Sequence, residues 1–483
     1  MSSVSYRLDP LDRGFVGPLT RRQVAVLAAG LLLWMLFALA LSSVVIGCVI
    51  AALAAGISIP PFAGQPIINW LPVWCGWMFR GRWARRWVRP LHLVTGGPLS
   101  NGPALPPWLG GLRIIAHPVE HWAAIHDVSG KTITAHLQVA GAGFTCLSPD
   151  QMDFLLSGWG QVFGAVPADD GLVRITWSDV ARGVPLVDHD EWAAGLRDAD
   201  GNQAVYRRFV ATQQPLRHDL IVTISLQVAS LRHAAAQAEA MDRLRAAVAV
   251  AADALCDAKL TVHGPLTSGE VAYLMRLGLD PTGVEPPGGM RPGSLVHTLG
   301  HVPVGAAGPM YANCSLSDVR IDASTHRTFW VESWPERRQA ADWFDPILAC
   351  ELDESIEQRV FTMVIEPVSE TKAVNELRHA AARHGGDEQA ATEGRGRFDA
   401  FKRRKADAVD EREHELADGH VPVAYVGLVT ITTAQPDGLD RATRALKRRC
   451  ARHRVFLREL WGRMDVGFAA GLPIGLGLSR EPF

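Results

Sequence analysis

Three short motifs contain residue types that bind phosphate, dinucleotides or zinc in other proteins, and their spacing decides whether they can do so here. A phosphate-binding loop has the form G-x-x-x-x-G-K-[ST], so that backbone amides and the lysine converge on the phosphates. Gly130-Lys131-Thr132 matches its end, but Ile125 stands where the first glycine is required. The segment also lies between two strand-like runs instead of opening a helix, so we predict a hairpin turn.

The other two motifs also fail on spacing. Gly141-Ala142-Gly143 lacks the third glycine of a dinucleotide fingerprint, because Cys146 holds its place. His414-Glu415 and His420 put the two histidines too far apart for a zinc-protease helix, which needs them four residues apart on one face. The sequence also contains no G-x-S-x-G nucleophile elbow. We therefore predict a protein that is not an enzyme and that holds no cofactor or metal.

Charge and cysteine content exclude further classes of protein function. The formal net charge is −2, but through Arg89 nine arginines stand against two aspartates, which gives +7 and leaves −9 for the rest. An acidic remainder lacks the clustered Lys and Arg that phosphate contacts need, so no direct nucleic-acid contact is predicted. The seven cysteines are odd in number and have no close pairs, which favours reduced thiols over a disulfide framework or a zinc site.

The N-terminal region predicts a membrane anchor. No charged side chain occurs between Arg22 and Arg80, and the apolar run there is longer than one crossing of a bilayer core of roughly 30 Å requires. We predict an N-terminal segment at 1–22 and a transmembrane hairpin of two helices at 23–62. Arginines at both outer ends place both termini and the soluble domains in the cytoplasm. The alternatives are a twin-arginine export signal, a single tilted span or a buried core hairpin.

The next segment, 63–90, interleaves tryptophan with arginine. This composition is typical of a helix at headgroup depth, where indole rings lie in the interface and guanidinium groups reach lipid phosphates. We therefore predict an interfacial helix and a multi-pass protein of the cytoplasmic (inner) membrane, with a helix packed on the soluble domain as the alternative. The predicted membrane-interface residues are Trp70, Trp74, Trp77, Arg80, Arg82, Trp83, Arg85, Arg86, Trp87 and Arg89.

After a Gly- and Pro-rich linker at 91–110, the order of expected elements repeats over 111–290 and 291–483. Each half contains a β-α-β run, a helical insertion and a second β-α-β run, which without the insertion is the split β-α-β arrangement of ferredoxin-like domains. In the second half, for example, the pattern predicts a strand at 423–432 and a helix at 439–452. We predict an α+β fold in which two tandem ferredoxin-like units with helical insertions follow the hairpin. One larger α+β domain is the alternative.

The helical insertion of the second unit, 369–418, is highly charged. Opposite charges three and four residues apart support a solvated helix, and such a helix serves either as a docking arm for a partner subunit or merely as a solvated surface. The predicted partner-docking residues are Lys402, Arg403, Arg404, Lys405, Asp410, Glu411 and Glu413.

Several stretches of the chain resemble a known family. Gly419-His420, the run from Tyr425 to Thr432, Leu457 to Leu460 and Phe468 to Gly475 are similar to the N-terminal, non-motor part of conjugative type IV secretion ATPases of the VirB class. The region from Ile125 to Trp177 is similar to the start of that domain. The N-terminal hairpin resembles the small PrgI-like membrane subunits that accompany such ATPases. Together these features resemble an actinobacterial conjugation membrane protein family.

The resemblance implies a non-enzymatic inner-membrane structural subunit of a conjugation or type IV secretion-like transfer apparatus. Its expected partners are the lipid bilayer, other secretion or conjugation subunits and a separate motor ATPase, and the protein is expected to be oligomeric. An EccE-like component of type VII secretion and a membrane-bound enzyme with an unrecognised site are the alternatives. No catalytic residue can be carried over, because the motor motifs are absent from the sequence.

Overall fold

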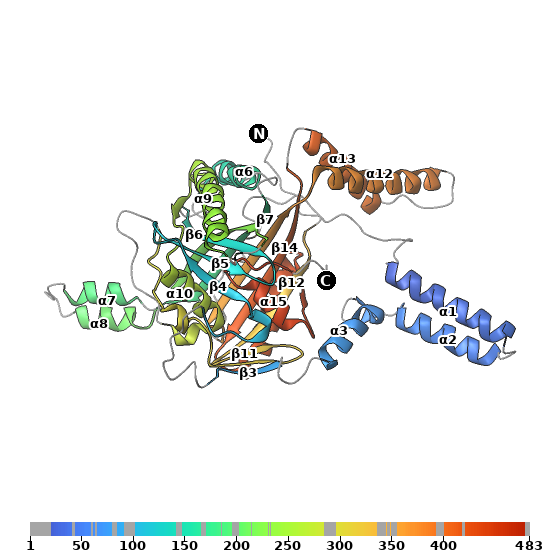
Figure 1. The fold of residues 1–483 in the computed structure, drawn as a ribbon, viewed down its shortest axis with the longest axis horizontal. Helices are drawn as coiled ribbons and strands as arrows, with labels where there is room; N and C mark the ends of the chain where they lie inside the picture. The colour runs from blue at the N-terminus through green and yellow to red at the C-terminus, as the bar shows by residue number, and fades with distance from the viewer. Residues whose placement is uncertain are drawn as a thin grey trace.

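The chain forms an α+β protein around one antiparallel sheet of 13 strands, and the described part of this computed structural model contains 12 α-helices (Figure 1). The structure describes residues 21–40, 44–58, 61–62, 65–79, 85–90, 102–141, 147–165, 171–184, 186–195, 202–213, 215–229, 231, 233–284, 296–335, 344, 348, 355–392, 400–417 and 421–478.

The sheet runs in the order β3-β10-β11-β12-β14-β13-β7-β8-β6-β5-β4, while β15 pairs with β12 and β9 pairs with β6. A separate two-stranded ribbon consists of β1 (Pro61–Phe62) and β2 (Gln65–Pro66). The sheet strands are β3 Arg86–Val88, β4 Leu112–Ala116, β5 Ala123–Asp127, β6 Thr132–Ala140, β7 Leu172–Gly183, β8 Leu216–Gln227, β9 Thr261–His263, β10 Tyr311–Cys314, β11 Val319–Ile321, β12 Ser324–Ser333, β13 Gln358–Pro367, β14 Val423–Thr433 and β15 Phe456–Glu459.

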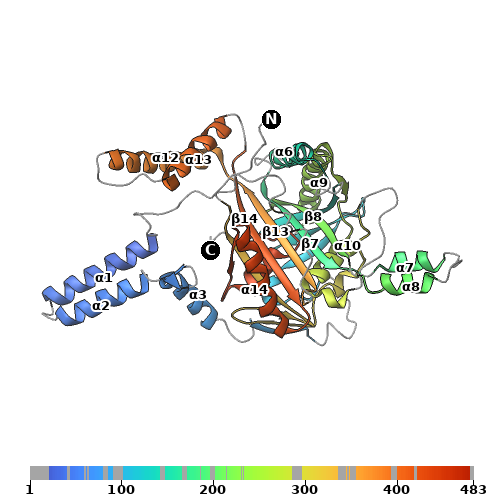
Figure 2. The ribbon, with the colours of Figure 1, turned by 180° about the vertical axis from the view of Figure 1, so that it is seen from behind.

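Helices cover both faces of the sheet, and two helical hairpins, α7–α8 and α12–α13, extend away from it (Figures 1 and 2). α10 and α15 pack on one face, and α6, α9 and α14 on the other. The helices are α1 Arg21–Ala40, α2 Val44–Ser58, α3 Ile67–Phe79, α6 Pro149–Ala165, α7 Val187–Ala194, α8 Gln203–Val210, α9 Ala234–Asp257, α10 Ser268–Leu279, α12 Glu370–Thr392, α13 Ala400–Ala417, α14 Pro436–Arg452 and α15 Met464–Gly471.

The turn between β5 and β6 is the one that the phosphate-loop comparison singled out. Asp127 pairs with Thr132 across the hairpin, and Asp127 Oδ1 accepts hydrogen bonds from the backbone amides of Ser129 and Gly130, both at 2.9 Å. Lys131 has a positive φ of 52°, as tight hairpin turns often require. The predicted hairpin turn is confirmed.

The alternation of side chains along β8 shows how the two faces of the sheet differ. Val222, Ile224 and Leu226 point to the face under α9 and join its apolar core. Thr223 and Ser225 point to the opposite face, because successive strand residues alternate. The pattern in the sequence suggests a solvated polar face, yet both side chains are fully buried. The polar row therefore lies inside the protein.

The prediction of two separate ferredoxin-like units is wrong, because the two units share one sheet. The strand orders β9-β6-β8-β7 and β15-β12-β14-β13 repeat each other, but β7 and β13 pair over Ile175–Arg182 and Gln358–Ile365, so that the two halves share one continuous sheet. An unpaired edge strand exposes a row of backbone donors and acceptors, and pairing edge to edge satisfies them. The boundary at 290/291 stays a prediction.

The predicted transmembrane hairpin is also wrong. α1 and α2 do form a helical pair over 21–58, but among the residues that the structure describes no helix is both long and apolar enough to cross a bilayer. α2 has 15 residues, which at about 1.5 Å per residue gives roughly 22 Å, short of a core of about 30 Å. The predicted multi-pass localisation in the inner membrane is therefore corrected as well.

The segment predicted as one interfacial helix, 63–90, is a helix followed by a strand, and both join the sheet domain. In α3, Trp70 is buried, with its ring centroid 6.3 Å from that of Trp461. In β3, Trp87 pairs with Ala312 of β10 and packs against the core. These contacts fit the alternative of a helix packed on the domain.

The remaining predicted interface residues are placed as follows. The guanidinium of Arg85 lies 4.5 Å from the ring centroid of Trp77, and that of Arg86 lies 5.8 Å from the ring of Tyr311. Arg89 donates from Nη2 to the Gly305 carbonyl at 2.7 Å. Trp74 is exposed on α3, whereas Arg80, Arg82 and Trp83 lie outside the described residues.

Candidate functional site

A buried row of hydroxyl and basic side chains lies on the sheet face beneath α15. The hydroxyls of Thr134 and Ser225, on neighbouring strands, are 2.8 Å apart. The segment that follows α15 covers them: Arg174 donates from Nε to the Gly475 carbonyl at 2.8 Å, and Ser225 donates to the same oxygen at 3.3 Å. The row therefore binds the chain's own backbone, which satisfies part of its hydrogen-bonding capacity.

The close approach of this segment requires glycine at position 475. Gly475 has a φ of 71°, and a Cβ at this position would lie 2.4 Å from the Thr223 hydroxyl and 2.9 Å from a methyl of Thr134. Nearby, the Thr362 hydroxyl donates to the Gly471 carbonyl at 2.9 Å. Side chains of three strands, β7, β8 and β13, thus donate to backbone carbonyls of α15 and the segment after it.

Two histidines on the same face are fully buried. Burial lowers the pKa of His136 to about 4, and the nearby Ile474 backbone offsets only part of that shift, since neither ring nitrogen of His136 makes a hydrogen bond of good geometry within the described residues. Burial also lowers the pKa of His326 to about 4, although its ring nitrogens face the Thr432 hydroxyl and the Leu279 carbonyl, both at 2.9 Å. Both side chains are therefore neutral at physiological pH.

Charged side chains are buried where β7, β8 and β13 adjoin. On one face, His218 Nδ1 lies 2.8 Å from Asp179 Oδ1, and Arg359 Nη2 lies 3.5 Å from Asp179 Oδ2. On the other face, Arg217 Nη2 lies 3.0 Å from Asp219 Oδ1. A His–Asp pair can move protons in an active site, but here each carboxylate is also paired with a buried arginine within the sheet. The arrangement fits a structural ion cluster that joins the two halves.

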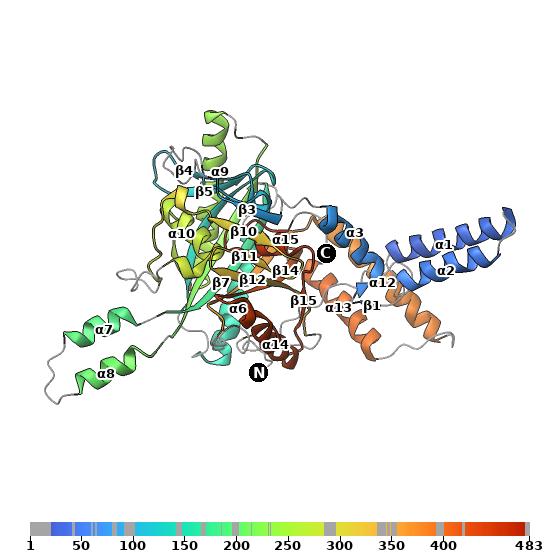
Figure 3. The ribbon, with the colours of Figure 1, turned by 90° about the horizontal axis from the view of Figure 1, so that it is seen from below.

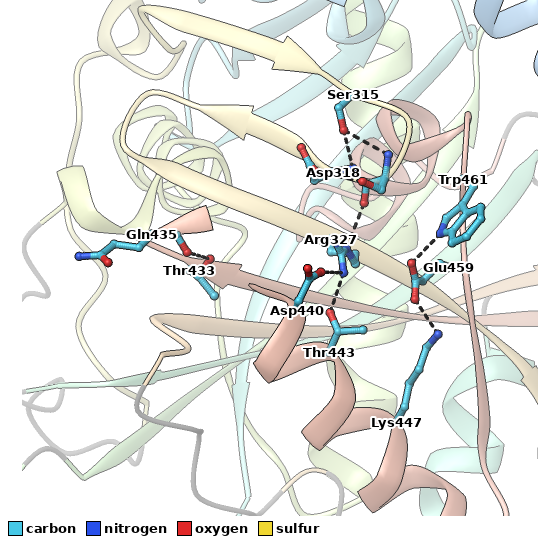
Figure 4. Close-up of polar contacts among 11 residues, drawn as sticks. Ser315, Asp318, Arg327, Thr433, Gln435, Asp440, Thr443, Lys447, Glu459 and Trp461 are labelled. Carbon is cyan, nitrogen blue, oxygen red and sulfur yellow. Dashed lines mark hydrogen bonds and ion pairs between the residues drawn. The ribbon is translucent and has the colours of Figure 1, made fainter. Parts of the chain in front are cut away.

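The outer side of the second half carries a polar network that fixes α14 against β12 (Figure 4). Arg327, on β12, is almost completely buried, and its Nη1 donates to Asp440 Oδ1 at 2.8 Å and to the Thr443 hydroxyl at 3.1 Å. Its Nε donates to the Ser317 carbonyl at 3.1 Å in the β10–β11 turn. One guanidinium therefore ties the helix to two neighbouring parts of the sheet.

A second contact fixes the other end of α14. Lys447 Nζ lies 2.6 Å from Glu459 Oε1, and the Trp461 indole donates to Glu459 Oε2 at 2.6 Å (Figure 4). Burial alone would raise the pKa of Glu459, but the hydrogen bonds from Lys447 and Trp461 outweigh it and lower that pKa. The carboxylate is thus held in its charged form, and α14 is a rigid part of the body.

The two faces of α14 differ sharply in character. One face packs Leu439, Ala442, Leu446 and Cys450 into the core. The outer face presents a row of arginines at helical spacing, so that their side chains lie on one stripe. These exposed residues, which we call the α14 arginine row, are Arg441, Arg444, Arg448 and Arg452.

The predicted docking residues lie on α13, in the hairpin that we call the α12–α13 arm. Arg403, Asp410 and Glu413 are exposed, and Glu411 is half-buried. Lys402, Arg404 and Lys405 fall within α13, but their side chains lie outside the described residues. The buried side of α13 contains Ala408 and Val409. The structure thus brings the described docking residues onto one projecting helix.

An apolar groove of about 460 Å³ lies between α1 and α3. Its lining includes Val26 of α1 and Ile68 of α3, and the other lining residues are Ala25, Leu71, Pro72 and Cys75. Large apolar side chains of the α1–α2 pair, such as Leu32 and Val45, are also exposed. The groove offers apolar contact area and lacks the convergent polar groups of a catalytic pocket.

The α14 arginine row was missed at the level of sequence, where the acidic remainder of the chain was treated as uniform. The signal is present in the helix predicted at 439–452, since arginines at 441, 444, 448 and 452 follow the helical repeat. The hydroxyl row was missed as well, because threonine and serine on alternating strand positions are equally typical of a solvated face.

Comparison with known proteins gives no further identification. No family model matches the sequence, and no curated protein matches it either.

Proposed function

We propose that this protein is a non-enzymatic structural subunit of a conjugation or type IV secretion-like transfer apparatus, and that it docks other subunits, including a separate motor ATPase. The observation that carries the proposal is the pairing of a rigid sheet body with charged helical surfaces that face outward. The α14 arginine row and the α12–α13 arm display charge at regular helical spacing, which is the form that selective docking between proteins commonly takes.

The places of the resembling stretches support the proposal. The run from Tyr425 to Thr432 is β14, Leu457 to Leu460 contains most of β15, and Phe468 to Gly475 covers the end of α15 and the segment after it. β12 pairs with both β14 and β15, and α15 packs against the same strands. These three stretches therefore meet in one part of the core, as a shared domain would require.

The buried polar groups favour a structural role over chemistry. Arg174 and Ser225 are occupied by the Gly475 carbonyl, and His136 and His326 are enclosed in the core. A catalytic group must reach a substrate, whereas these groups hold the segment after α15 against the sheet. The charged side chains of the α14 arginine row, by contrast, are exposed on the outer face of the helix, where a partner can reach them.

The proposal is tested by whether a motor ATPase co-purifies with the tagged chain. The full chain, tagged and produced with the motor ATPase encoded nearest to it, is expected to co-purify with that ATPase, while the purified chain alone hydrolyses no ATP above background. A chain with the α12–α13 arm replaced by a short turn serves as a matched variant of the same body. Failure of the intact chain to retain any motor ATPase contradicts the docking function, and ATP turnover by the purified chain contradicts the non-enzymatic role.

A further inference from the structure

The charge patterns of α13 and α14 are opposite in sign at matched positions. On α13, Arg403 is followed by Asp407 and Asp410, and all three are exposed. On α14, Asp437 is followed by Arg441 and Arg444 at the same intervals, and these three are also exposed. The order on α13 is thus positive, negative, negative, and on α14 negative, positive, positive.

We propose that the α12–α13 arm of one copy of this chain docks on the α14 arginine row of a second copy. Laid side by side in the same direction, the two helices bring Arg403 against Asp437, Asp407 against Arg441 and Asp410 against Arg444. In the opposite direction Arg403 meets the end of α14 that carries Arg452, so that this pair is like-charged. The complementarity therefore identifies the partner helix, and the parallel direction avoids the like-charge contact between Arg403 and Arg452.

The arrangement of the chain makes this a contact between copies. α13 packs on α12 at the end of an arm that leaves the sheet body, whereas α14 packs on the body itself (Figures 2 and 3). The arm begins and ends in the β13–β14 hairpin, where the Val368 amide donates to the Pro422 carbonyl at 2.9 Å. The hairpin anchors its base, so the arm presents α13 to a neighbour.

A contact of this kind joins copies head to tail. Each copy has one arm and one α14 arginine row, and the two surfaces differ, so the interface is heterologous and builds a ring or an open filament. The inference rests on the proposed function, because it identifies the partner of a surface proposed there for docking. A structural subunit of a transfer apparatus gains a repeating scaffold from such a contact.

The strength of the contact follows from its exposure to solvent. Ion pairs at the surface contribute little individually, and screening shortens their range to about 10 Å at 0.1 M salt. Two helices of 18 and 17 residues bury less surface than a stable interface of about 1,200 Å² or more. Assembly should therefore depend on protein concentration and weaken steeply with salt.

The experiment is sedimentation velocity of the full chain after nuclease treatment. At about 50 mM salt the average mass is expected to rise to at least about twice the 52.4 kDa of the chain as protein concentration increases, and to return to the monomer value at about 500 mM salt. Two variants reverse one surface each: Asp407→Arg with Asp410→Arg on the arm, and Arg441→Glu with Arg444→Glu on α14. Each variant alone is expected to remain monomeric.

The decisive sample is the equimolar mixture of these two variants. Every arm in the mixture then has a complementary row on the other variant, so assembly is expected to return, with the two variants alternating. The matched control, Asp253→Arg with Asp257→Arg, makes the same change of charge at helical spacing on the exposed side of α9, and is expected to assemble like the unmodified chain.

Three results would overturn the inference. They are an unmodified chain that is monomeric at low salt, single variants that still assemble, or a mixture that does not regain assembly. If in addition the arm-reversed variant alone loses the motor ATPase, the arm docks the motor and the proposed function stands without this contact. If nuclease treatment dissolves the assembly, the arginine row binds nucleic acid instead of a second copy.

Discussion

The sheet body and the α12–α13 arm both contain charged side chains, but these side chains are buried and paired in the body and exposed in the arm. In the body, charged groups such as Arg327 and Glu459 are enclosed and paired, so they fix the geometry of α14. In the arm, charged groups such as Asp407 and Asp410 are exposed to solvent, and the buried residues in the described part of their helix are Ala408 and Val409. The comparison teaches that stability resides in the body, whereas the arm carries recognition.

The largest effect is expected from removing an aromatic side chain in the body. Phe361 is fully buried, with its ring centroid 5.4 Å from that of Trp177 and 5.0 Å from that of Phe344. Phe361→Ala leaves a cavity at the strand that joins the two halves, so the free energy of unfolding should fall by about 3–5 kcal/mol. Urea denaturation measures this change. An effect below about 1 kcal/mol would mean that the junction between the halves is not part of the cooperative core.

The next effect is acid destabilisation of the body. The pKa of His136 and of His326 is about 4 in the folded chain against 6.5 for an ordinary histidine, so the unfolded chain binds more protons between these values. The free energy of unfolding therefore falls as the pH drops through this window, by about 2 kcal/mol for each histidine between about pH 7 and pH 5. Urea midpoints at the two pH values test this prediction, and the arm-less chain should show the same loss.

Replacing a glycine by alanine should destabilise the protein in the sheet body and stabilise it in the α12–α13 arm. Gly475→Ala places a Cβ 2.4 Å from the Thr223 hydroxyl at a φ of 71°, so it should cost about 1–3 kcal/mol. Gly385→Ala, on exposed α12, meets nothing within 4 Å and should stabilise the helix by about 0.5–1 kcal/mol. Thermal unfolding of the two variants compares them directly. Equal shifts in the same direction would remove the distinction between body and arm.

The α12–α13 arm could be predicted from the sequence more completely than the sheet body. The arm could be predicted, because alternating charges at helical spacing need only local information, and the insertion at 369–418 contains both α12 and α13. The helix at 439–452 and the strand at 423–432 were likewise placed within a few residues of α14 and β14. These elements are specified by their own periodicity, which a single sequence carries.

The errors arose where distant residues decide the outcome. The pairing of β7 with β13 depends on two edges far apart in sequence, and neither strand signals its partner. The burial of Thr223 and Ser225 depends on a segment some 250 residues later that lays the Gly475 carbonyl against them. The α1–α2 pair was predicted as a hairpin from its apolar run, but the lengths of its helices were not constrained by composition alone.

The smallest effect is expected from removing the arm altogether. Pro367 and Val423 face each other at the base of the arm in the β13–β14 register, so replacing 369–421 with a short turn closes the same hairpin. The closure entropy of a loop changes only slowly with its length, and the arm contributes little to the core. The free energy of unfolding, measured by urea denaturation, should therefore change by no more than about 1 kcal/mol. The same chain should fail to assemble at low salt, since it keeps the α14 arginine row but has no acidic partner for it. A chain without the arm that unfolds much more easily would show that the arm supports the sheet, and one that still assembles would show that α14 has another partner.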